Sequence, residues 1–338
     1  INYQEGMGDM RDKADRLQKL TEAIGKDWGF TAEEAADADR AAFLSKSDLA
    51  TGMVTEFTEL QGEMGKEYAL LDGEKPEVAQ AIFEQYMPRF AGDILPEQEI
   101  GRALSLADKL DNLAATFLRG LIPTGSQDPF ALRRQTIGAV NILTDGKIHW
   151  DIRRGIEAAL ALLPGDEETK KTVLSQIEDF FRQRIKAIML DEGIAYDIID
   201  AVLAGPVDDI YALFLKARSM AESQLKGEAE LRQAVTRLAN ITKGKTGGKV
   251  DPSLFTEDVE KKLQDAFEAV SAKALPLFAS YEYGKALPAL KELTAPINDY
   301  LDNVMVMVDD EAVKNNRISQ LLATLALFNT WGDFSKLV

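Results

Sequence analysis

Carboxylates at helical spacing are the first residues in this sequence whose types and positions could do chemistry. Asp108 and Asp111 lie three residues apart in the segment ALSLADKLDNL, so both lie on one face of any helix formed there. A third aspartate, Asp48, lies in the segment LSKSDLATGMV. Such carboxylates either bind a metal ion or accept hydrogen bonds from nearby donors, including backbone N–H groups. The sequence therefore allows two interpretations, a metal site and a structural network.

The absence of histidine from both segments weakens the metal interpretation. The run Ala-Asp-Lys-Leu-Asp resembles the way HD-type phosphohydrolases present their last metal ligand, but their adjacent His-Asp pair is replaced by Ser47-Asp48. The only histidine, His149, lies far outside these segments. Two oxygen ligands without imidazole make a poor transition-metal site. We expect an HD-like domain without metal ligands, with Asp48 and Asp108 at its degenerate positions. A metal-dependent HD-family phosphohydrolase is the alternative.

Basic residues form groups suited to phosphate. Arg133 and Arg134 follow PTGSQDPFAL, where glycine and hydroxyl residues lead into a helix N-terminus that could accept an anion. The segment 226–249 holds more Lys and Arg than acidic residues. The alternative for both groups is structural: a capped helix whose arginines pair with carboxylates, and a solvated helix end with its loop.

Helices must position these residues, because apolar side chains recur at helical spacing almost throughout. The expected helices are 33–50, 76–91, 98–120, 129–143, 151–163, 167–191, 208–222, 227–242, 257–279, 283–302 and 310–329. Asp128 suits an N-cap and Pro129 suits the first helical position. Val304–Val308 is the best candidate for a strand, although a buried connector is equally compatible. Loop residues place a domain boundary between 144 and 166.

Composition limits the class of protein. The 338 residues suffice for two domains, and a hydrophobic content of 46% with 28% charged residues fits a soluble globular chain. No 18-residue apolar run is present, and cysteine is absent, which is compatible with the cytosol. The chain begins with Ile1, so we interpret it as a fragment or a processed product. The net charge of −17 argues against nucleic acid unless a local basic patch acts within an acidic protein.

Several long motifs resemble those of one protein family, and they follow one another along this sequence in the same order as in that family. They are RAAFLSKSDLATGMVTEFTELQGEMGKEYALLDGE at 40–74, ADKLDNLAATFLRGLIPTGSQDPFALRR at 107–134 and VMVMVDDEAVKNNR at 304–317. Together with YDIIDAVLA and RLANI they resemble the β subunit of bacterial glycyl-tRNA synthetases, and residues 303–338 resemble the end of its anticodon-binding domain. The departures are Ser47, where the family usually has Ala, and Ile318, where Leu commonly follows Asn-Arg.

The resemblance implies an all-α fold: a degenerate HD-like domain over 1–150, then a helical region over 151–338 ending in a DALR-type anticodon-binding domain. It implies the tRNA-binding, non-catalytic part of the β subunit of a glycine–tRNA ligase, supporting ATP-dependent glycine attachment by a separate α subunit. The implied partners are tRNA(Gly) and the α subunit, with no membrane and no DNA, in the cytoplasm. ATP and Mg would serve the holoenzyme, with no cofactor or metal in this fragment.

The expected RNA contacts are polar residues of the basic segments and of the last helix. Single-stranded bases in RNA loops are read by stacking and by side-chain hydrogen bonds, and phosphates by basic residues. The candidates are Arg133, Arg134, Arg237, Asn240, Lys243, Lys245, Asn316 and Arg317. No catalytic residue is expected. Without the resemblance, a helical interaction scaffold would be the default interpretation.

Overall fold

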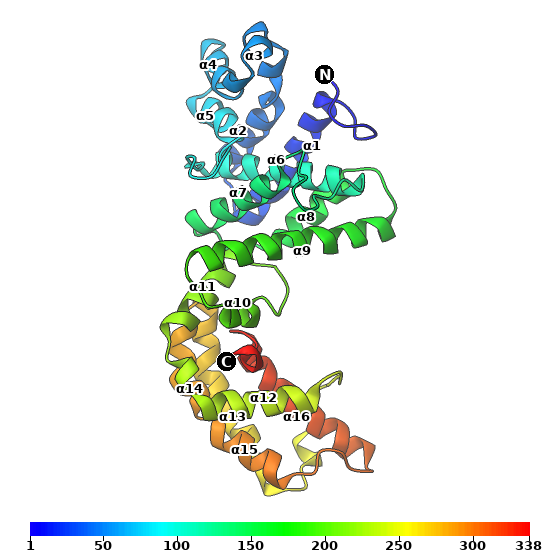
Figure 1. The fold of residues 1–338 in the computed structure, drawn as a ribbon, viewed down its shortest axis with the longest axis vertical. Coiled ribbons are helices and arrows are strands. Elements are labelled where there is room, and N and C mark those ends of the chain that lie inside the picture. Colours follow the sequence, from blue (N-terminus) through cyan, green and yellow to red (C-terminus); the bar gives the residue numbers. More distant parts are fainter. The chain divides into compact units, whose positions relative to one another are not determined.

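The molecule is built from helices. The computed structural model describes residues 1–338 and contains sixteen α-helices, six short 3-10 helices and no β-sheet (Figure 1). The all-α expectation is confirmed. Two compact units are present: unit 1 comprises residues 1–185 and 207–211, and unit 2 comprises 186–206 and 212–338. The division lies within helix α9 (Glu167–Asp191), later than the loop residues between 144 and 166 had suggested.

Unit 1 is organised around α6 (Glu99–Leu118), which packs against five other helices. These are α1 (Met10–Trp28), α2 (Ala32–Leu44), α5 (Pro76–Glu84), α7 (Leu132–Asp145) and α8 (Ile152–Ala161), while the short α3 (Gly52–Glu56) and α4 (Glu63–Leu71) lie between α2 and α5 in the chain. Apolar residues at helical spacing predict a buried stripe of Leu106, Leu110, Leu113, Phe117 and Leu121. The first four are buried, whereas Leu121 lies beyond the end of α6 and is exposed. Because α6 is enclosed, its polar residues must find partners inside the protein.

The first helix was not among those expected, although it has clear end signals. Asp9 and Asp12 form a capping box, and α1 ends at Gly29 with a φ of 75°. The helix expected over 76–91 instead ends at Glu84. Pro88 follows within the next turn, and proline cannot continue a helix because it lacks a backbone N–H and clashes with the preceding turn.

Unit 2 contains the C-terminal helices and an aromatic core. The helices are α10 (Tyr196–Val202), most of α11 (Ile210–Glu222), α12 (Ala229–Thr242), α13 (Asp258–Ala279), α14 (Leu287–Lys291), α15 (Thr294–Asn303) and α16 (Glu311–Asn329). Tyr300, Phe328, Trp331 and Phe334 are fully buried, so these aromatic rings form the core rather than a stacking surface. The single helix expected over 283–302 is divided into a 3-10 turn, α14 and α15.

The apolar run after α15 forms a connector and no strand. Val304 and Val306 are buried, whereas Met305 and Met307 are exposed. Successive side chains alternate between the interior and solvent although the backbone bends at Val306 and Met307, where the Val308 N–H donates to the Val306 oxygen at 3.2 Å. No second strand pairs with this segment. The interpretation as a buried connector is therefore the correct one of the two that the sequence allowed.

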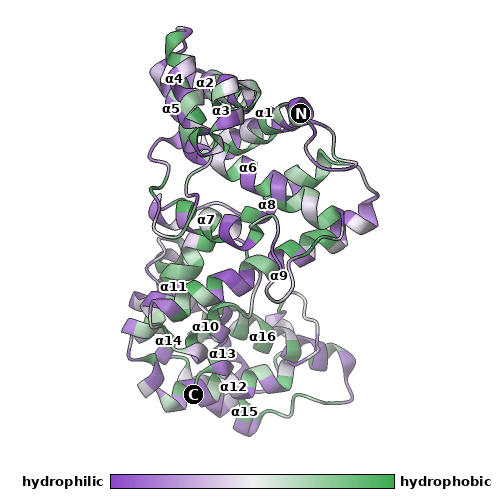
Figure 2. Cartoon of the chain, turned by 45° about the horizontal axis from the view of Figure 1, so that its top comes forward, coloured by the Kyte–Doolittle hydropathy of each residue, from purple (hydrophilic) through white to green (hydrophobic).

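Hydrophilic and hydrophobic residues alternate along most helices (Figure 2). This pattern is expected for helices that cover a core with one face and meet water with the other. None of the helices combines the length and the apolar character that crossing a membrane requires.

Candidate functional site

Asn316 lies buried in the first half of α16, where its side chain holds the chain that precedes α13. Its amide nitrogen donates to the backbone oxygen of Asp251 at 2.9 Å, and its amide oxygen accepts from the Asp251 backbone N–H at 2.7 Å. Both polar atoms of the Asn316 side chain are therefore hydrogen-bonded to the backbone of a single residue, Asp251. Only 5% of the residue is exposed, so it offers little surface to a ligand.

Arg317 is also buried and joins three segments of unit 2. Its Nε donates to Glu260 Oε1 at 3.0 Å, and its two terminal nitrogens donate to the Met305 backbone oxygen and the Thr256 hydroxyl, each at 2.7 Å. Burial alone would raise the pKa of Glu260, but the hydrogen bond from Arg317 and two backbone N–H groups hold it below its usual value. Arg317 therefore fastens the connector and the start of α13 to α16.

This placement does not support the expectation that Asn316 and Arg317 contact RNA directly. Their polar groups are satisfied within unit 2 and are almost fully removed from solvent. The spacing in the sequence carried a signal for this. Arg317 precedes Leu321, Thr324 and Phe328 by four, seven and eleven residues, and all three are buried. Arg317 thus belongs to the buried stripe of α16.

The segment Lys243–Lys249, here called the lysine loop, is the most accessible of the expected basic groups. Lys243 and Lys249 are exposed, Lys245 is half-buried, and none of the three forms a salt bridge. The loop is anchored where the Gly248 N–H donates to Ser319 Oγ at 2.8 Å. Gly247 packs so closely on α16 that an added Cβ would lie 3.2 Å from the Ser319 Cα.

Arg237 and Asn240 lie on α12 just before the lysine loop and are exposed. Arg237 pairs with Asp302 at 2.6 Å and donates to Asn298 Oδ1 at 2.9 Å. Because this pair is solvent-exposed, it contributes little stability and could exchange for a phosphate contact. Four of the unit 2 candidates therefore lie together at the end of α12 and in the loop that follows it: Arg237, Asn240, Lys243 and Lys245. The other two, Asn316 and Arg317, are buried in α16.

Arg133 and Arg134 begin α7 in unit 1, in a different setting from the one expected. The helix begins at Leu132 rather than Pro129, and the Asp128 carboxylate accepts from the N–H groups of Leu132 and Arg133 at 2.8 and 2.9 Å. Asp128 does cap the helix, but from four residues upstream. Since a carboxylate already occupies this helix end, it is not an open anion site.

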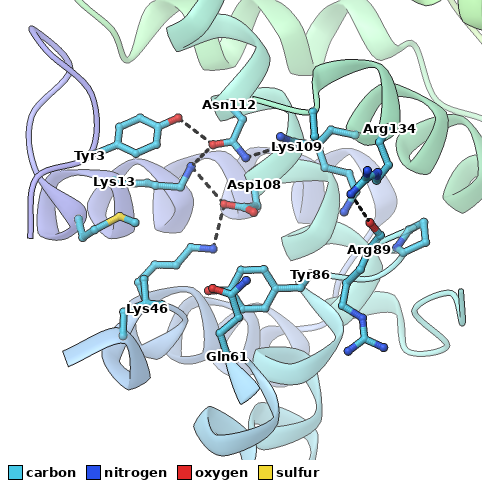
Figure 3. Close-up of a pocket in the computed structure, with 15 residues that line it drawn as sticks. Tyr3, Lys13, Lys46, Gln61, Tyr86, Arg89, Asp108, Lys109, Asn112 and Arg134 are labelled. Atoms are coloured by element: carbon cyan, nitrogen blue, oxygen red, sulfur yellow. Dashed lines mark hydrogen bonds and ion pairs between the residues drawn. The ribbon is translucent and has the colours of Figure 1, made fainter. Parts of the chain in front are cut away.

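A cavity of about 310 Å³ lies beside Asp108 in unit 1 and is called here the Asp108 pocket (Figure 3). The ammonium groups of Lys13 and Lys46 each lie 3.1 Å from Asp108 Oδ1. Burial alone would raise the pKa of Asp108, but these two lysines hold it well below its usual value. Behind them, Asp111 accepts from Lys13 at 2.8 Å and from Arg16 at 2.7 Å.

Lys109 adds a further buried cation to this pocket. Its ammonium donates to the Met87 backbone oxygen at 3.0 Å and to Ser105 Oγ at 2.6 Å. Burial lowers the pKa of Lys109 to about 8. Gly138 of α7 leaves space for this side chain, because an added Cβ there would lie 3.0 Å from the Lys109 Cε.

The degenerate HD positions do not fit a metal ion. Asp48 Oδ2 accepts the Gly62 N–H at 2.7 Å, and Asp108 faces two lysines. No group of three or more His, Asp or Glu side chains is placed to hold a metal ion. Hard cations need several oxygen ligands, so lysine ammonium groups take the place that a cation would occupy beside Asp108. The residues present therefore do not support the phosphohydrolase alternative.

Sequence reasoning missed Lys13, Lys46 and Lys109. A signal was present for two of them, because Lys46 stands two residues before Asp48 and Lys109 directly after Asp108. Lys109 also lies four residues before the buried Leu113 on α6. A lysine within a buried stripe requires an anionic or carbonyl partner.

Comparison with known proteins covers both units. The family model described as "Glycyl-tRNA synthetase beta subunit" matches residues 1–204, and that described as "DALR anticodon binding domain" matches 231–332. A glycine–tRNA ligase β subunit from Desulforamulus reducens is 41% identical over the whole chain and 49% of its own length. One from Clostridioides difficile is 44% identical with the same coverage. The chain spans about half the length of the curated relatives it matches. It belongs to the glycyl-tRNA synthetase β-subunit family.

Proposed function

We propose that this chain is the tRNA-binding, non-catalytic part of a glycyl-tRNA synthetase β subunit. It would hold tRNA(Gly) while a separate α subunit attaches glycine in an ATP- and Mg-dependent reaction in the cytoplasm. The family, and the match of an anticodon-binding domain to residues 231–332, support this proposal. No residue of the chain is assigned a part in the chemical step.

The observation that carries the proposal is the lysine loop, which lies within the matched anticodon-binding region. None of its three lysines forms a salt bridge, although the chain has a net charge of −17; Lys249 alone acts on a carboxylate, by lowering the pKa of the nearby Asp251. Ammonium groups that are not neutralised by the protein remain available to RNA phosphates. Arg237 and Asn240 stand on the adjoining end of α12, where phosphate and base contacts can combine.

The buried candidates have a supporting role in this proposal. Asn316 holds the backbone at Asp251, just beyond the lysine loop, and Arg317 holds the connector at Met305. Both segments meet the beginning of α16 (Figure 1). A fixed loop binds RNA with a smaller loss of conformational entropy than a mobile one. We therefore assign Asn316 and Arg317 to positioning and the lysine loop to contact.

Replacing Lys243, Lys245 and Lys249 together by glutamine tests the proposal. We expect tRNA(Gly) affinity to fall by roughly tenfold or more at moderate salt, because three phosphate contacts are removed. The slope of log affinity against log salt should become shallower by about 2, at about 0.7 for each single-stranded phosphate contact. Fluorescence anisotropy with labelled tRNA at several salt concentrations measures both quantities.

A matched control keeps the overall charge change the same. Lys261, Lys273 and Lys285 are exposed in unit 2 and lie outside the lysine loop. Replacing these three by glutamine also removes three positive charges, yet should leave the salt slope unchanged. Equal losses in the two triple variants would show that only net charge matters. A chain that binds no tRNA even at low salt would contradict the proposal.

A further inference from the structure

The lining of the Asp108 pocket carries more positive than negative charge. Lys13, Lys46, Arg89, Lys109 and Arg134 line it, with Asp108 as the only carboxylate among the lining residues. Lys13 is balanced from behind by Asp111, and Arg89 by Asp93. Lys46 shares Asp108 with Lys13, and neither Lys109 nor Arg134 forms a salt bridge. In a chain of net charge −17, this excess is a local feature that needs an explanation.

Two of these cations are buried with less than a full counter-charge, because Lys46 shares Asp108 with Lys13 and Lys109 forms no salt bridge. Lys46 is 7% exposed and Lys109 is 3% exposed. Each ammonium group has three N–H donors. Lys109 uses two of them on neutral oxygens, the Met87 carbonyl and the Ser105 hydroxyl. Removing ammonium groups from water without a full counter-charge is unfavourable, and an anion in the adjoining cavity would offset that cost.

The pocket combines this cationic side with an apolar wall. Met10, Leu49, Tyr86 and Pro88 also line the cavity, and the Lys46 ammonium lies 4.2 Å from the centre of the Tyr86 ring. A volume of about 310 Å³ is at the lower end of the range for small-molecule sites. A ligand that fills it would present an anionic group to the lysines and an organic part to the wall.

We propose that the Asp108 pocket binds a small organic phosphate, with its phosphate group between Lys46, Lys109 and Arg134. These cations come from three separate parts of unit 1: the segment before the 3-10 turn Ser47–Ala50, α6 and α7. A tetrahedral phosphate has three terminal oxygens and can accept from several directions, whereas a carboxylate has two oxygens in one plane. The pocket binds this ligand without hydrolysing it, because Asp108 is held by lysines and no metal site adjoins it.

Isothermal titration calorimetry of the 338-residue chain tests this inference. The probes are AMP, ribose 5-phosphate, inorganic phosphate and sulfate, each in a chloride buffer. We expect one saturable site for at least one of the organic phosphates, binding more tightly than inorganic phosphate or sulfate. The bound organic phosphate should remain intact after incubation with Mg²⁺, and a chelator should leave its affinity unchanged.

Variants locate the site. Arg134 is exposed, so Arg134→Gln should fold normally, and it should weaken binding by about tenfold through loss of a charge-assisted contact. Lys46→Met should have a similar effect, with thermal unfolding as the check on its fold. Lys26→Met, an exposed unit 1 lysine outside the pocket, should bind as the parent does. The inference fails if no probe binds, if sulfate binds equally well, or if Arg134→Gln leaves the affinity unchanged. It is independent of tRNA binding through the lysine loop.

Discussion

Arg317 and Glu260 form the pair on which the arrangement at the start of α16 most depends. The two side chains are 5% and 0% exposed and are joined at 3.0 Å. Removing one partner from such a pair leaves a buried charge or donor without compensation, which is strongly destabilising. Glu260 also accepts from the backbone N–H groups of Thr256 and Glu257, so it fixes the entry to α13 as well.

The pair predicts how the stability of unit 2 depends on pH. The pKa of Glu260 is lowered in the folded chain from its usual value of 4.5. The folded state therefore binds fewer protons than the unfolded state, so this stability is present above pH 4.5 and is lost as pH falls through the lowered pKa. Glu260→Gln should cost about 3 kcal/mol at neutral pH and reduce the acid sensitivity of α13 and α16. Hydrogen exchange of these helices at neutral and acidic pH measures both effects.

The same experiment contains its own control. Exchange in α6 should respond equally in the parent chain and in Glu260→Gln, because α6 belongs to unit 1. If α13 and α16 lose protection with falling pH as steeply in Glu260→Gln as in the parent, another group controls the acid response, and the role assigned to Glu260 is wrong.

Among the elements, regular helices could be predicted and the details of their ends could not. The helix expected at 167–191 has the bounds of α9, because its apolar spacing and flanking turn residues agree. The expected helix start at Pro129 was wrong, because α7 begins at Leu132. The Asp128 carboxylate reaches the Leu132 N–H only through the fold of the intervening loop, which the sequence pattern does not define. In the same way, the partner of Arg317 lies 57 residues away in sequence, and packing alone brings it close.

The element that most affects the proposed interface is the lysine loop with its anchor on α16. Asn316→Ala removes both hydrogen bonds to the Asp251 backbone while leaving all three lysines in place. We expect tRNA affinity to fall severalfold because the loop is less well ordered before binding. The salt slope should not change, because the number of phosphate contacts is the same.

Asn316→Ala distinguishes a residue that positions the lysine loop from a residue that contacts RNA itself. The control is Asn303→Ala, which removes an exposed amide that bonds only within α15. It should bind tRNA as the parent does. A shallower salt slope in Asn316→Ala, like that expected for the lysine triple variant, would contradict the positioning role. The measurement is the same anisotropy titration over several salt concentrations.

At the scale of the whole molecule, our proposal assigns RNA recognition to this chain and glycine attachment to a separate subunit. The chain spans about half the length of its relatives, and it contains no group of His, Asp or Glu side chains placed to hold a metal ion. Its net charge of −17 repels RNA at long range, so any binding must rely on a local basic surface. We propose that this surface lies in unit 2, because the family model of an anticodon-binding domain matches residues 231–332.

Competition between RNA fragments tests this central claim most directly. The labelled tRNA(Gly) is bound to the chain and challenged with an anticodon stem-loop or with an acceptor-stem minihelix of equal length. We predict that the anticodon stem-loop displaces the tRNA at lower concentration, and that the Lys243, Lys245 and Lys249 triple variant loses this preference. Displacement by the minihelix alone, or equal displacement by both fragments, would contradict the account.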